Sequence, residues 1–454
     1  MQISIATPAE VSEIINKFER RGFQIYIVGG LVRDVLLTRQ IYDWDLTTDA
    51  TPEQILEILP ESFYDNKFGT VGVKTDGRPY EITTFRTETT YSNFRHPDAV
   101  AWGKSLEEDL KRRDFTINAM ALKRVSGKGR VVKYELIDMY GGLEDLKLKL
   151  IRAVGKPEER FAEDALRMMR AVRIAAQLGF SIEEETFKAI KTHAQNIKQI
   201  SAERVRDELL KIMASDFPAD GYLILRNTGL GIILLPEMES TFGVKQQSPG
   251  RHHIYDVGTH SVEALRHCPS PDPITRLATL IHDVGKVQTQ RVYADGKITF
   301  YNHEMESERI AKNIAARLRF SNEQKDKFIG LVRWHQFSVD ERQTDSAVRR
   351  FIKNTGGENI PDMLALRTGD RLGGGARETS WRLEEFKRRL VEVQKQPFRV
   401  QDLKISGVDV MGIKNIPSGP LVGKYLETLF DEVVEKGLEN ERDVLIERLK
   451  QLTL

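Results

Sequence analysis

Two aspartates one residue apart are the first candidates for chemistry in this chain. Asp43 and Asp45 lie in the stretch YDWDL, and Asp43 follows the glycine pair Gly29 and Gly30 by thirteen residues. On an extended strand, residues i and i+2 project to the same face, so both carboxylates would lie side by side and Trp44 would face the other way. Paired carboxylates can hold Mg²⁺, which prefers oxygen ligands. This arrangement predicts a magnesium site that joins a nucleotide to a hydroxyl group.

The glycine pair ends the apolar run IYIVGG, which is typical of a buried strand. Because Gly29 and Gly30 lack side chains, their backbone N–H groups can approach a phosphate closely. Arg33 follows in the first turn of a predicted helix, where it could contact phosphate. Glu81 lies in the predicted strand YEITTFR, which could pair beside the Asp43 strand. It is either a third carboxylate of the site or a solvated strand residue.

Two further segments combine arginine with aspartate. EEDLKRRDFTINAMAL places Arg112, Arg113 and Asp114 just before a predicted apolar helix, where Asp114 either caps that helix or bonds a ribose hydroxyl. In RFAEDALRMMR, Asp164 and Arg167 fall within one turn of a predicted helix and could share a face. The simpler alternative for this second pair is a surface ion pair.

A second group of candidates consists of histidines and aspartates that could bind a metal. They are His260, His282, Asp283, His303, His335 and Asp370. The adjacent His-Asp pair ends the apolar helix predicted for RLATLIHD, and imidazole with carboxylate suits a divalent transition metal. Neighbouring side chains can hold one ion only if the helix end is distorted or closely surrounded by other helices. Any one of these histidines could instead be a core residue.

The elements that must position these residues divide the chain into regions. Its 454 residues exceed one ordinary core and indicate roughly three or four units. Residues 1–150 mix helices with short strands, starting with a helix predicted near residues 7–21, and residues 151–215 carry charged amphipathic helices. Residues 216–375 gather most of the histidines on predicted helices, and residues 376–454 are again helical. The predicted fold class is therefore α+β, with a small mixed sheet and helices at the N-terminus and an all-α remainder.

Composition and charge limit where we expect the protein to work and what we expect it to bind. The net charge of +1 hides local basic clusters, so a nucleic-acid surface would have to be local. One cysteine, Cys268, excludes an intramolecular disulfide framework. The N-terminus lacks the pattern of a secretory signal, and no apolar run approaches membrane-spanning length. We therefore expect a cytoplasmic protein without a membrane partner, while the oligomeric state stays open.

The ordered motifs GGLVRD, DWD, RRDFTINAMA, GGLEDL, EDALRMMRAVR and ERVRDELLK, over roughly residues 20–215, resemble the class II tRNA nucleotidyltransferases and poly(A) polymerases. The resemblance implies a nucleotidyltransferase head at 1–150 and catalytic Mg²⁺ on Asp43 and Asp45, beside which Glu81 stays the candidate third catalytic carboxylate. It also implies that Asp164 and Arg167 read the edges of CTP or ATP in place of a nucleic-acid template. The nucleotide-binding set would be Gly29, Gly30, Arg33, Arg112, Arg113, Asp114, Asn118, Asp164, Arg167, Arg170 and Arg173.

Within that family, the complete EDALR motif and the segment RTETTYSNFRHPDAVAWGKSLEEDLKRRDF look more like CCA-adding enzymes than poly(A) polymerases. The expected activity is template-independent addition of CMP and AMP from CTP and ATP to the tRNA 3′ end. Addition of A only, or of a poly(A) tail, is the nearest alternative. The tail LKISGVDVM with GPLVGKYLETLF resembles the segment that helps to hold tRNA in bacterial relatives. Met139 departs from the family's commoner D-P-x-G-G pattern.

The histidine series resembles the HD phosphohydrolase domains, whose pattern H…HD…D implies a metal-bound water that hydrolyses a phosphoester. This pattern is matched by His260, His282, Asp283 and Asp370. His303 and His335 occupy the places where two-metal members add ligands. The unit at 216–375 is then either an active phosphatase or cyclic phosphodiesterase, or a body that only holds RNA. A further alternative is an HD hydrolase whose head binds nucleotides in a regulatory role.

Overall fold

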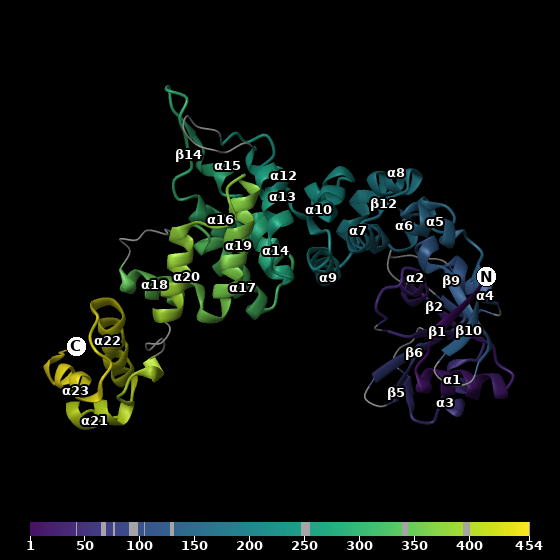
Figure 1. Ribbon diagram of the computed structural model, residues 1–454, viewed down its shortest axis with the longest axis horizontal. Helices are drawn as coiled ribbons and strands as arrows, with labels where there is room; N and C mark the ends of the chain where they lie inside the picture. Colours follow the sequence, from purple (N-terminus) through teal and green to yellow (C-terminus); the bar gives the residue numbers. More distant parts are fainter. Residues whose placement is uncertain are drawn as a thin grey trace. The chain divides into compact units, whose positions relative to one another are not determined.

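The structure of the chain is a computed structural model that describes residues 1–453 except 42, 65–69, 76–77, 90–98, 104, 128–130, 247–254, 338–343 and 394–399. The chain forms two compact units, Met1–Leu234 and Leu235–Leu454 (Figure 1). The first unit contains the sheet and the second is almost entirely helical. The α+β class predicted from the sequence is therefore confirmed. The sequence-based boundaries after residues 150, 215 and 375 stay predictions.

An eight-stranded sheet forms the core of the N-terminal unit, in the order β1-β10-β9-β2-β3-β6-β5-β4. The strands are β1 (Gln2–Ala6), β2 (Ile25–Val28), β3 (Asp45–Thr48), β4 (Ser62–Tyr64), β5 (Thr70–Thr75), β6 (Arg78–Thr84), β9 (Met120–Ser126) and β10 (Val131–Asp138). The β3–β6 pair is parallel, and the other pairs of this sheet are antiparallel. A separate hairpin joins β7 (Arg86–Thr89) to β8 (Ala99–Trp102).

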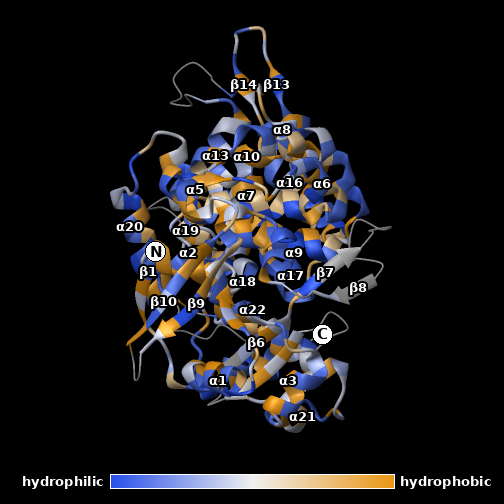
Figure 2. Cartoon of the chain, turned by 90° about the vertical axis from the view of Figure 1, so that its right-hand side faces the viewer, coloured by the Kyte–Doolittle hydropathy of each residue, from blue (hydrophilic) through white to orange (hydrophobic). Residues whose placement is uncertain are grey.

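Amphipathic helices cover the sheet and continue beyond it. In α1 (Ala9–Arg20), the buried residues Val11, Ile14, Ile15 and Phe18 follow the i, i+3, i+4, i+7 spacing of one helical face. Figure 2 shows this helix with both hydrophilic and hydrophobic residues. The other helices near the sheet are α2 (Gly30–Leu36), α3 (Pro52–Ile58), α4 (Leu106–Lys111) and α5 (Gly142–Leu148). They are followed by α6 (Pro157–Glu163), α7 (Leu166–Leu178), α8 (Glu184–His193), α9 (Ala202–Met213), α10 (Pro218–Asn227) and α11 (Leu230–Leu234).

Three local predictions differ from the structure. The first residues form β1, which pairs with β10, although the sequence pattern predicted only the helix that follows. The apolar segment after Asp114 is a short 3-10 turn (Thr116–Asn118) and then β9, not a helix, because its residues fill a central strand of the sheet. The predicted continuous helix around Asp164 is broken, since α6 ends at Glu163 and Asp164 has extended backbone angles.

The described part of the C-terminal unit consists mainly of α-helices. They are α12 (Pro236–Glu239), α13 (Val257–His267), α14 (Pro273–Ile281), α15 (Lys286–Thr289), α16 (His303–Arg317), α17 (Asn322–Trp334), α18 (Asp345–Thr355), α19 (Ile360–Gly373), α20 (Trp381–Val393), α21 (Gly407–Lys414), α22 (Pro420–Lys436) and α23 (Arg442–Gln451). A small hairpin pairs β13 (Arg291–Val292) with β14 (Ile298–Thr299). Helices α21 to α23 share a hydrophobic cluster that includes Val410, Leu429 and Leu445.

Close packing of α13 against α19 depends on glycine. A Cβ at Gly373 would lie 2.4 Å from the backbone nitrogen of Ala264, and one at Gly369 would lie 2.5 Å from the oxygen of the same residue. Because glycine has no Cβ, α13 and α19 can approach this closely, and no other residue fits at either position. The close approach brings His260 on α13 against Asp370 on α19. The packing of the unit thus assembles its candidate site.

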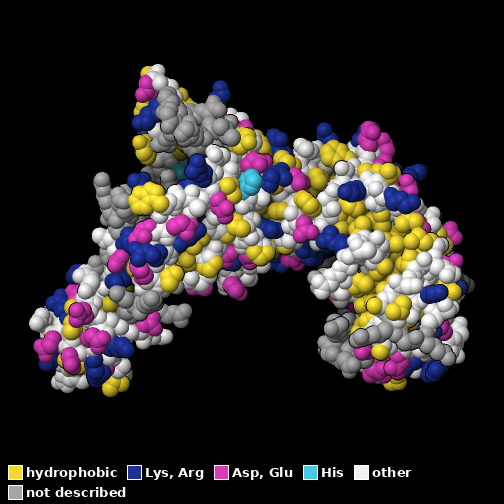
Figure 3. Space-filling view, in the orientation of Figure 1, with side chains coloured by type: hydrophobic (Ala, Val, Ile, Leu, Met, Phe, Trp, Pro, Cys, Tyr) yellow, Lys and Arg dark blue, Asp and Glu magenta, His cyan; other side chains and the backbone are white. Residues whose placement is uncertain are grey.

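The surface carries both signs of charge. On the face drawn in Figure 3, Lys and Arg side chains alternate with Asp and Glu over both units. This distribution agrees with the net charge of +1. In the described part of the chain, no helix is both long enough and apolar enough to cross a bilayer.

Candidate functional sites

Carboxylates from neighbouring parallel strands meet at one end of the N-terminal sheet. The register of β3 and β6 places Asp45 directly opposite Glu81. Asp43 lies just before β3 and is exposed, whereas Trp44 between the two aspartates is buried. Burial raises the pKa of Asp45 above its ordinary value, Arg113 opposes this shift, and the charges of Glu81 and Asp43 add to it. The pairing of Asp45 with Glu81 puts two carboxylates side by side, and a divalent cation fits such oxygen ligands.

The backbone at Gly29 lies close to the Asp45 carboxylate. Gly29 has a φ of 77°, and a Cβ there would lie 3.2 Å from Asp45 Oδ2 and 3.3 Å from Arg113 Nη1. A side chain at this position would be strained and would occupy the space between carboxylate and guanidinium. Arg33, in contrast, binds Asp34 and Asn118, with its Nη1 donating to Asn118 Oδ1 at 2.9 Å.

A buried acid holds the arginine pair. Arg112 Nη2 donates to Asp109 Oδ1 at 2.5 Å, and Arg113 Nη2 donates to Asp109 Oδ2 at 3.1 Å. The side chain of Asp109 is fully buried. Burial alone would raise its pKa, but Arg113 and Arg112 outweigh that effect and lower it. One ionised carboxylate therefore fixes both guanidinium groups at the pocket, a role that the sequence reasoning missed.

Asp114 belongs to a second buried pair. Its Oδ1 accepts from the backbone N–H of Phe115 and from Asn118 Nδ2, and its Oδ2 accepts from Arg170 Nε at 2.8 Å and Nη2 at 2.5 Å. Burial opposes ionisation of Asp114, but Arg170 outweighs it and lowers the pKa of this carboxyl to about 2. The side chain does not cap the helix that was predicted after it, because the segment that follows is a short 3-10 turn and then β9.

The helix break at Asp164 orients its carboxylate. Its Oδ1 accepts from the backbone N–H of Leu166 at the start of α7, and its Oδ2 accepts from Arg204 Nη2 at 3.0 Å. Arg167 instead binds Glu163 Oε2 at 2.5 Å and the backbone oxygen of Arg112 at 3.0 Å. Asp164 and Arg167 are thus held separately, although both line the same cavity.

That cavity has a volume of about 510 Å³ and collects most of the predicted residues. Its lining includes Gly29, Gly30, Asp45, Glu81, Arg112, Arg113, Asp114, Asn118, Asp164, Arg167 and Arg170. Three predicted residues are not among the described lining residues: Asp43, Arg33 and Arg173, the last of which binds Glu208 at 2.8 Å. Arg86 and Arg204 line the cavity without having been predicted. The cavity is therefore rich in cationic groups around a carboxylate cluster.

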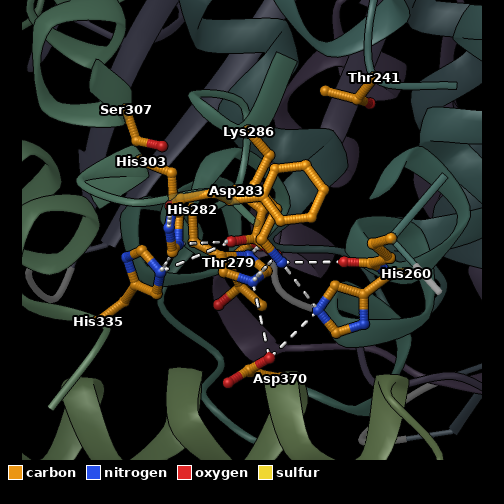
Figure 4. A network of polar contacts seen from close by, with 12 residues as sticks. Thr241, His260, Thr279, His282, Asp283, Lys286, His303, Ser307, His335 and Asp370 are labelled. Atoms are coloured by element: carbon orange, nitrogen blue, oxygen red, sulfur yellow. Dashed lines mark hydrogen bonds and ion pairs between the residues drawn. The ribbon is translucent and has the colours of Figure 1, made fainter. Parts of the chain in front are cut away.

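All six predicted residues meet in the C-terminal unit, where Asp283 lies between two groups of histidines (Figure 4). Its Oδ2 lies 3.2 Å from His282 Nε2 and 3.6 Å from His260 Nε2. Its Oδ1 lies 3.2 Å from His303 Nε2 and 3.6 Å from His335 Nε2. Asp370 Oδ1 completes the first group at 3.1 Å from His260 Nε2.

The imidazoles are oriented by backbone carbonyls. Nδ1–H of His282 donates to the oxygen of Thr279 at 2.6 Å, that of His303 to Phe300 at 2.9 Å and that of His335 to Val332 at 2.7 Å. A carbonyl accepts only from a protonated Nδ1, so Nε2 is the ring nitrogen that each of these histidines directs toward Asp283 and the one available to a metal. This donor set fits divalent transition metals, and the shared carboxylate fits two of them.

Charged side chains outside the metal-binding groups complete this centre. Lys286 Nζ donates to Asp283 Oδ2 at 2.6 Å and to Gln246 Oε1 at 2.9 Å, and Arg367 Nη1 donates to Asp370 Oδ2 at 2.9 Å. They line a cavity of about 260 Å³. Sequence reasoning named neither cation, although the i+3 spacing of Lys286 from Asp283 and of Asp370 from Arg367 was readable.

Comparison with known proteins adds independent findings. The family model "Poly A polymerase head domain" matches residues 25–152, "Probable RNA and SrmB- binding site of polymerase A" matches 179–242, and "tRNA nucleotidyltransferase domain 2" matches 297–449. The CCA-adding enzyme of Ligilactobacillus salivarius is 32% identical over 440 residues, which cover 97% of this chain and 95% of that enzyme.

Other relatives align over a shorter stretch. The CCA-adding enzyme of Lactobacillus helveticus is 46% identical over 218 residues, so this chain spans about half (53%) of that relative's length. Among solved structures, the Bacillus stearothermophilus CCA-adding enzyme in complex with CTP is similar with a TM-score of 0.71 and 30% identity. That match covers 97% of this chain and 96% of the other chain.

Proposed function

This chain belongs to the family of CCA-adding enzymes, which are tRNA nucleotidyltransferases, and we propose that it adds CMP and AMP from CTP and ATP to the 3′ end of tRNA without a nucleic-acid template. The observation that carries this proposal is the pairing of Asp45 with Glu81 beside a cavity lined by arginines. Carboxylates suit a catalytic cation, while the arginines suit a triphosphate.

Asp45, Glu81 and Asp43 would hold Mg²⁺, whose charge would stabilise the attacking oxygen and the departing pyrophosphate. Arg112 and Arg113, held by Asp109, would bind the phosphates in a fixed geometry. The tRNA 3′ oxygen would form a bond to the α-phosphorus, and the bond from that phosphorus to the bridging oxygen would break. The hydroxyl gives up its proton, and pyrophosphate leaves.

Asp164 and Arg167 would select the base. A carboxylate accepts from the exocyclic amino group that both cytosine and adenine carry, and a guanidinium donates to a ring nitrogen or carbonyl oxygen. Both residues line the cavity. Arg170 and Asn118 would support the sugar end through Asp114.

The test is incorporation of labelled CTP or ATP, offered separately, into tRNA that lacks its 3′ end. We expect CTP incorporation by the parent protein and a loss of at least about 10³-fold in Asp45→Asn, because a cation ligand is gone. Asp49→Asn, on the same strand region but bound to Gln24, is the matched control. Incorporation of ATP alone would favour an A-adding enzyme, and long A tails would favour a poly(A) polymerase.

A specific observation favours a second activity. Asp283 lies between two groups of imidazoles whose Nε2 atoms converge on it, which suits a pair of divalent metals. We propose that this centre hydrolyses phosphoesters, such as phosphates at damaged RNA ends. Bound metal would supply an activated water, while Lys286 and Arg367 would attract the phosphate. Water oxygen would bond to phosphorus, and the ester oxygen would leave with a proton.

This second proposal is tested by metal analysis and phosphoester turnover. The parent protein should contain a divalent transition metal, and His282→Ala should lose both metal and turnover while nucleotide addition continues. His267→Ala, at the end of α13 outside the centre, is the control. Absence of turnover in the metal-loaded parent would leave the unit as an RNA-holding body. Turnover without nucleotide addition would instead indicate a hydrolase with a regulatory head.

Other expectations remain predictions. Helices α21 to α23 would contact tRNA, as the tail motif suggests, and the protein would work in the cytoplasm. Incubation of tRNA with a chain that lacks residues 400–454 would show weaker binding if the tail contributes. Unchanged affinity would contradict that role.

A further inference from the structure

The segment that joins β14 to α16 forms one wall of the histidine-aspartate cavity. Three consecutive residues, Thr299, Phe300 and Tyr301, line this cavity. Two residues later in the chain, His303 contributes its Nε2 to the metal-binding group. Asn302 between them has a left-handed φ of 59°, which turns the chain sharply before α16. The wall is therefore fixed close to the metal-binding atoms.

Thr299 carries an unexplained polar group. The residue is only 5% exposed, and its hydroxyl has no hydrogen-bond partner among the residues that the structure describes. A buried hydroxyl without a partner is unfavourable by roughly 1–3 kcal/mol. Because Thr299 lines the cavity, a polar ligand in the cavity could provide the missing partner. This observation points to a ligand and is independent of the metal-binding side chains.

Tyr301 gives the same wall an aromatic rim. Its side chain is 69% exposed although it lines the cavity, so the ring is open to solvent at the mouth. The neighbouring Phe300 lies under the Lys286 ammonium at 5.5 Å, which keeps a cation beside the aromatic pair. Arg367 adds a second cation whose buried Nε has no hydrogen-bond partner among the described residues. Aromatic rings beside cations are the common design for binding bases and phosphates of single-stranded nucleic acid.

We propose that Thr299 and Tyr301 form a nucleoside subsite of this cavity, in which Tyr301 stacks on the base and Thr299 bonds the sugar or phosphate. The proposal rests on the phosphoester chemistry proposed above and names its substrate class, a nucleotide or a single-stranded RNA end. A small phosphate without a base would use Lys286 and Arg367 but would gain nothing from Tyr301. A nucleotide and a small phosphate are therefore distinguished by whether their affinity depends on the Tyr301 ring.

Equilibrium binding tests this subsite without requiring turnover. The full chain would carry Asp164→Ala and Arg167→Ala, which removes the proposed base selection in the N-terminal cavity, and any phosphate binding that remains there is common to all the variants compared. Adenosine 3′-phosphate and ribose 5-phosphate are then titrated in the presence of Mn²⁺. We expect Tyr301→Ala to weaken binding of adenosine 3′-phosphate about tenfold, within the range known for base stacking, and to leave ribose 5-phosphate unchanged.

Matched variants distinguish the loss of the subsite from general damage to the fold. Tyr301→Phe keeps the ring and should bind like the parent, and Tyr293→Ala removes another exposed tyrosine, one outside the described cavity lining, and should have no effect. Thr299→Val should weaken both ligands several-fold. Equal binding of the two ligands by the parent, or equal effects of Tyr301→Ala and Tyr293→Ala, would overturn the subsite. Base-dependent binding without any hydrolysis would instead support the subsite and contradict the phosphoesterase.

Discussion

The cavity of the N-terminal unit and the centre of the C-terminal unit both gather buried carboxylates, but different side chains surround them. In the first, Asp109 and Asp114 are each bound by arginines that line the cavity. In the second, Asp283 is approached by four imidazoles and only one ammonium. Arginines stay charged and present cations to an anionic ligand. Imidazole nitrogens can instead bind a divalent metal directly, so that centre fits a cation.

The buried acids of the two units have different roles. Asp109 is a positioning group, because its charge is satisfied within the protein and its effect reaches a ligand only through Arg112 and Arg113. Asp283 is proposed to be a ligand itself, because both of its oxygens face nitrogen atoms that can bind metal. Substitutions should therefore affect metal content in one unit and nucleotide affinity in the other.

The largest effect is expected at Asp283. Asp283→Asn should weaken binding of both metals by at least about 10²-fold, because one shared ligand loses its charge. His303→Ala should remove only the metal held with His335. Metal content per chain, measured by atomic emission after dialysis, checks both changes. Equal loss in the two variants would show that the centre does not hold two separate ions.

A smaller effect is expected at Asp109. Asp109→Asn should raise the KM for CTP and ATP by roughly 10- to 100-fold, because both arginines lose the anion that holds them. Steady-state addition to tRNA measures this change. Glu107→Gln, which removes an exposed acid of the same helix, is the control and should stay near the parent. Similar KM values in the two variants would contradict the positioning role.

The pair of Asp114 with Arg170 should appear in the dependence of stability on pH. Since the pKa of Asp114 is lowered to about 2 in the folded state, its ionisation stabilises the fold above the ordinary pKa of 3.8 and this contribution is lost as pH falls toward 2. The contribution is on the order of 2 kcal/mol at pH 7. Denaturation of Asp114→Asn and parent at pH 7 and pH 3 should show a smaller difference at pH 3. A constant difference would refute this linkage.

The smallest effect is expected at Arg204, which orients Asp164 without belonging to the predicted site. Arg204→Lys keeps the charge but changes its reach, so the ratio of kcat/KM for CTP over ATP should shift by a few-fold up to about tenfold. Arg206→Lys, whose Nε binds Asp207 at the surface, is the control. A uniform loss for both nucleotides would mean that Arg204 supports the fold and not base selection.

The sequence predicted one feature of the N-terminal site and missed another. The strand that carries Glu81 was predicted because alternating apolar residues indicate a strand, and pairing beside the Asp43 strand was given as one possibility. The structure pairs the two strands in parallel and places Asp45 opposite Glu81. The helix break at Asp164 was not predicted, because EDALRMMR has good helical propensity throughout. Packing and the hydrogen bond from Leu166 to Asp164 override that propensity.

The residue types available for chemistry, the α+β class and the family could be predicted from the amino-acid sequence, since these follow from local patterns and ordered motifs. The charges that meet in space could not be predicted in this way, because they depend on the packing of distant segments. Asp109 with Arg112 and Arg113 lies within one helix and its end, but Asp164 meets Arg204 from forty residues away, and Asp283 meets His335 across the helical packing. The distance between helices depends on packing contacts, such as that of Gly373 with Ala264 between α13 and α19, and spacing along the chain does not encode that distance.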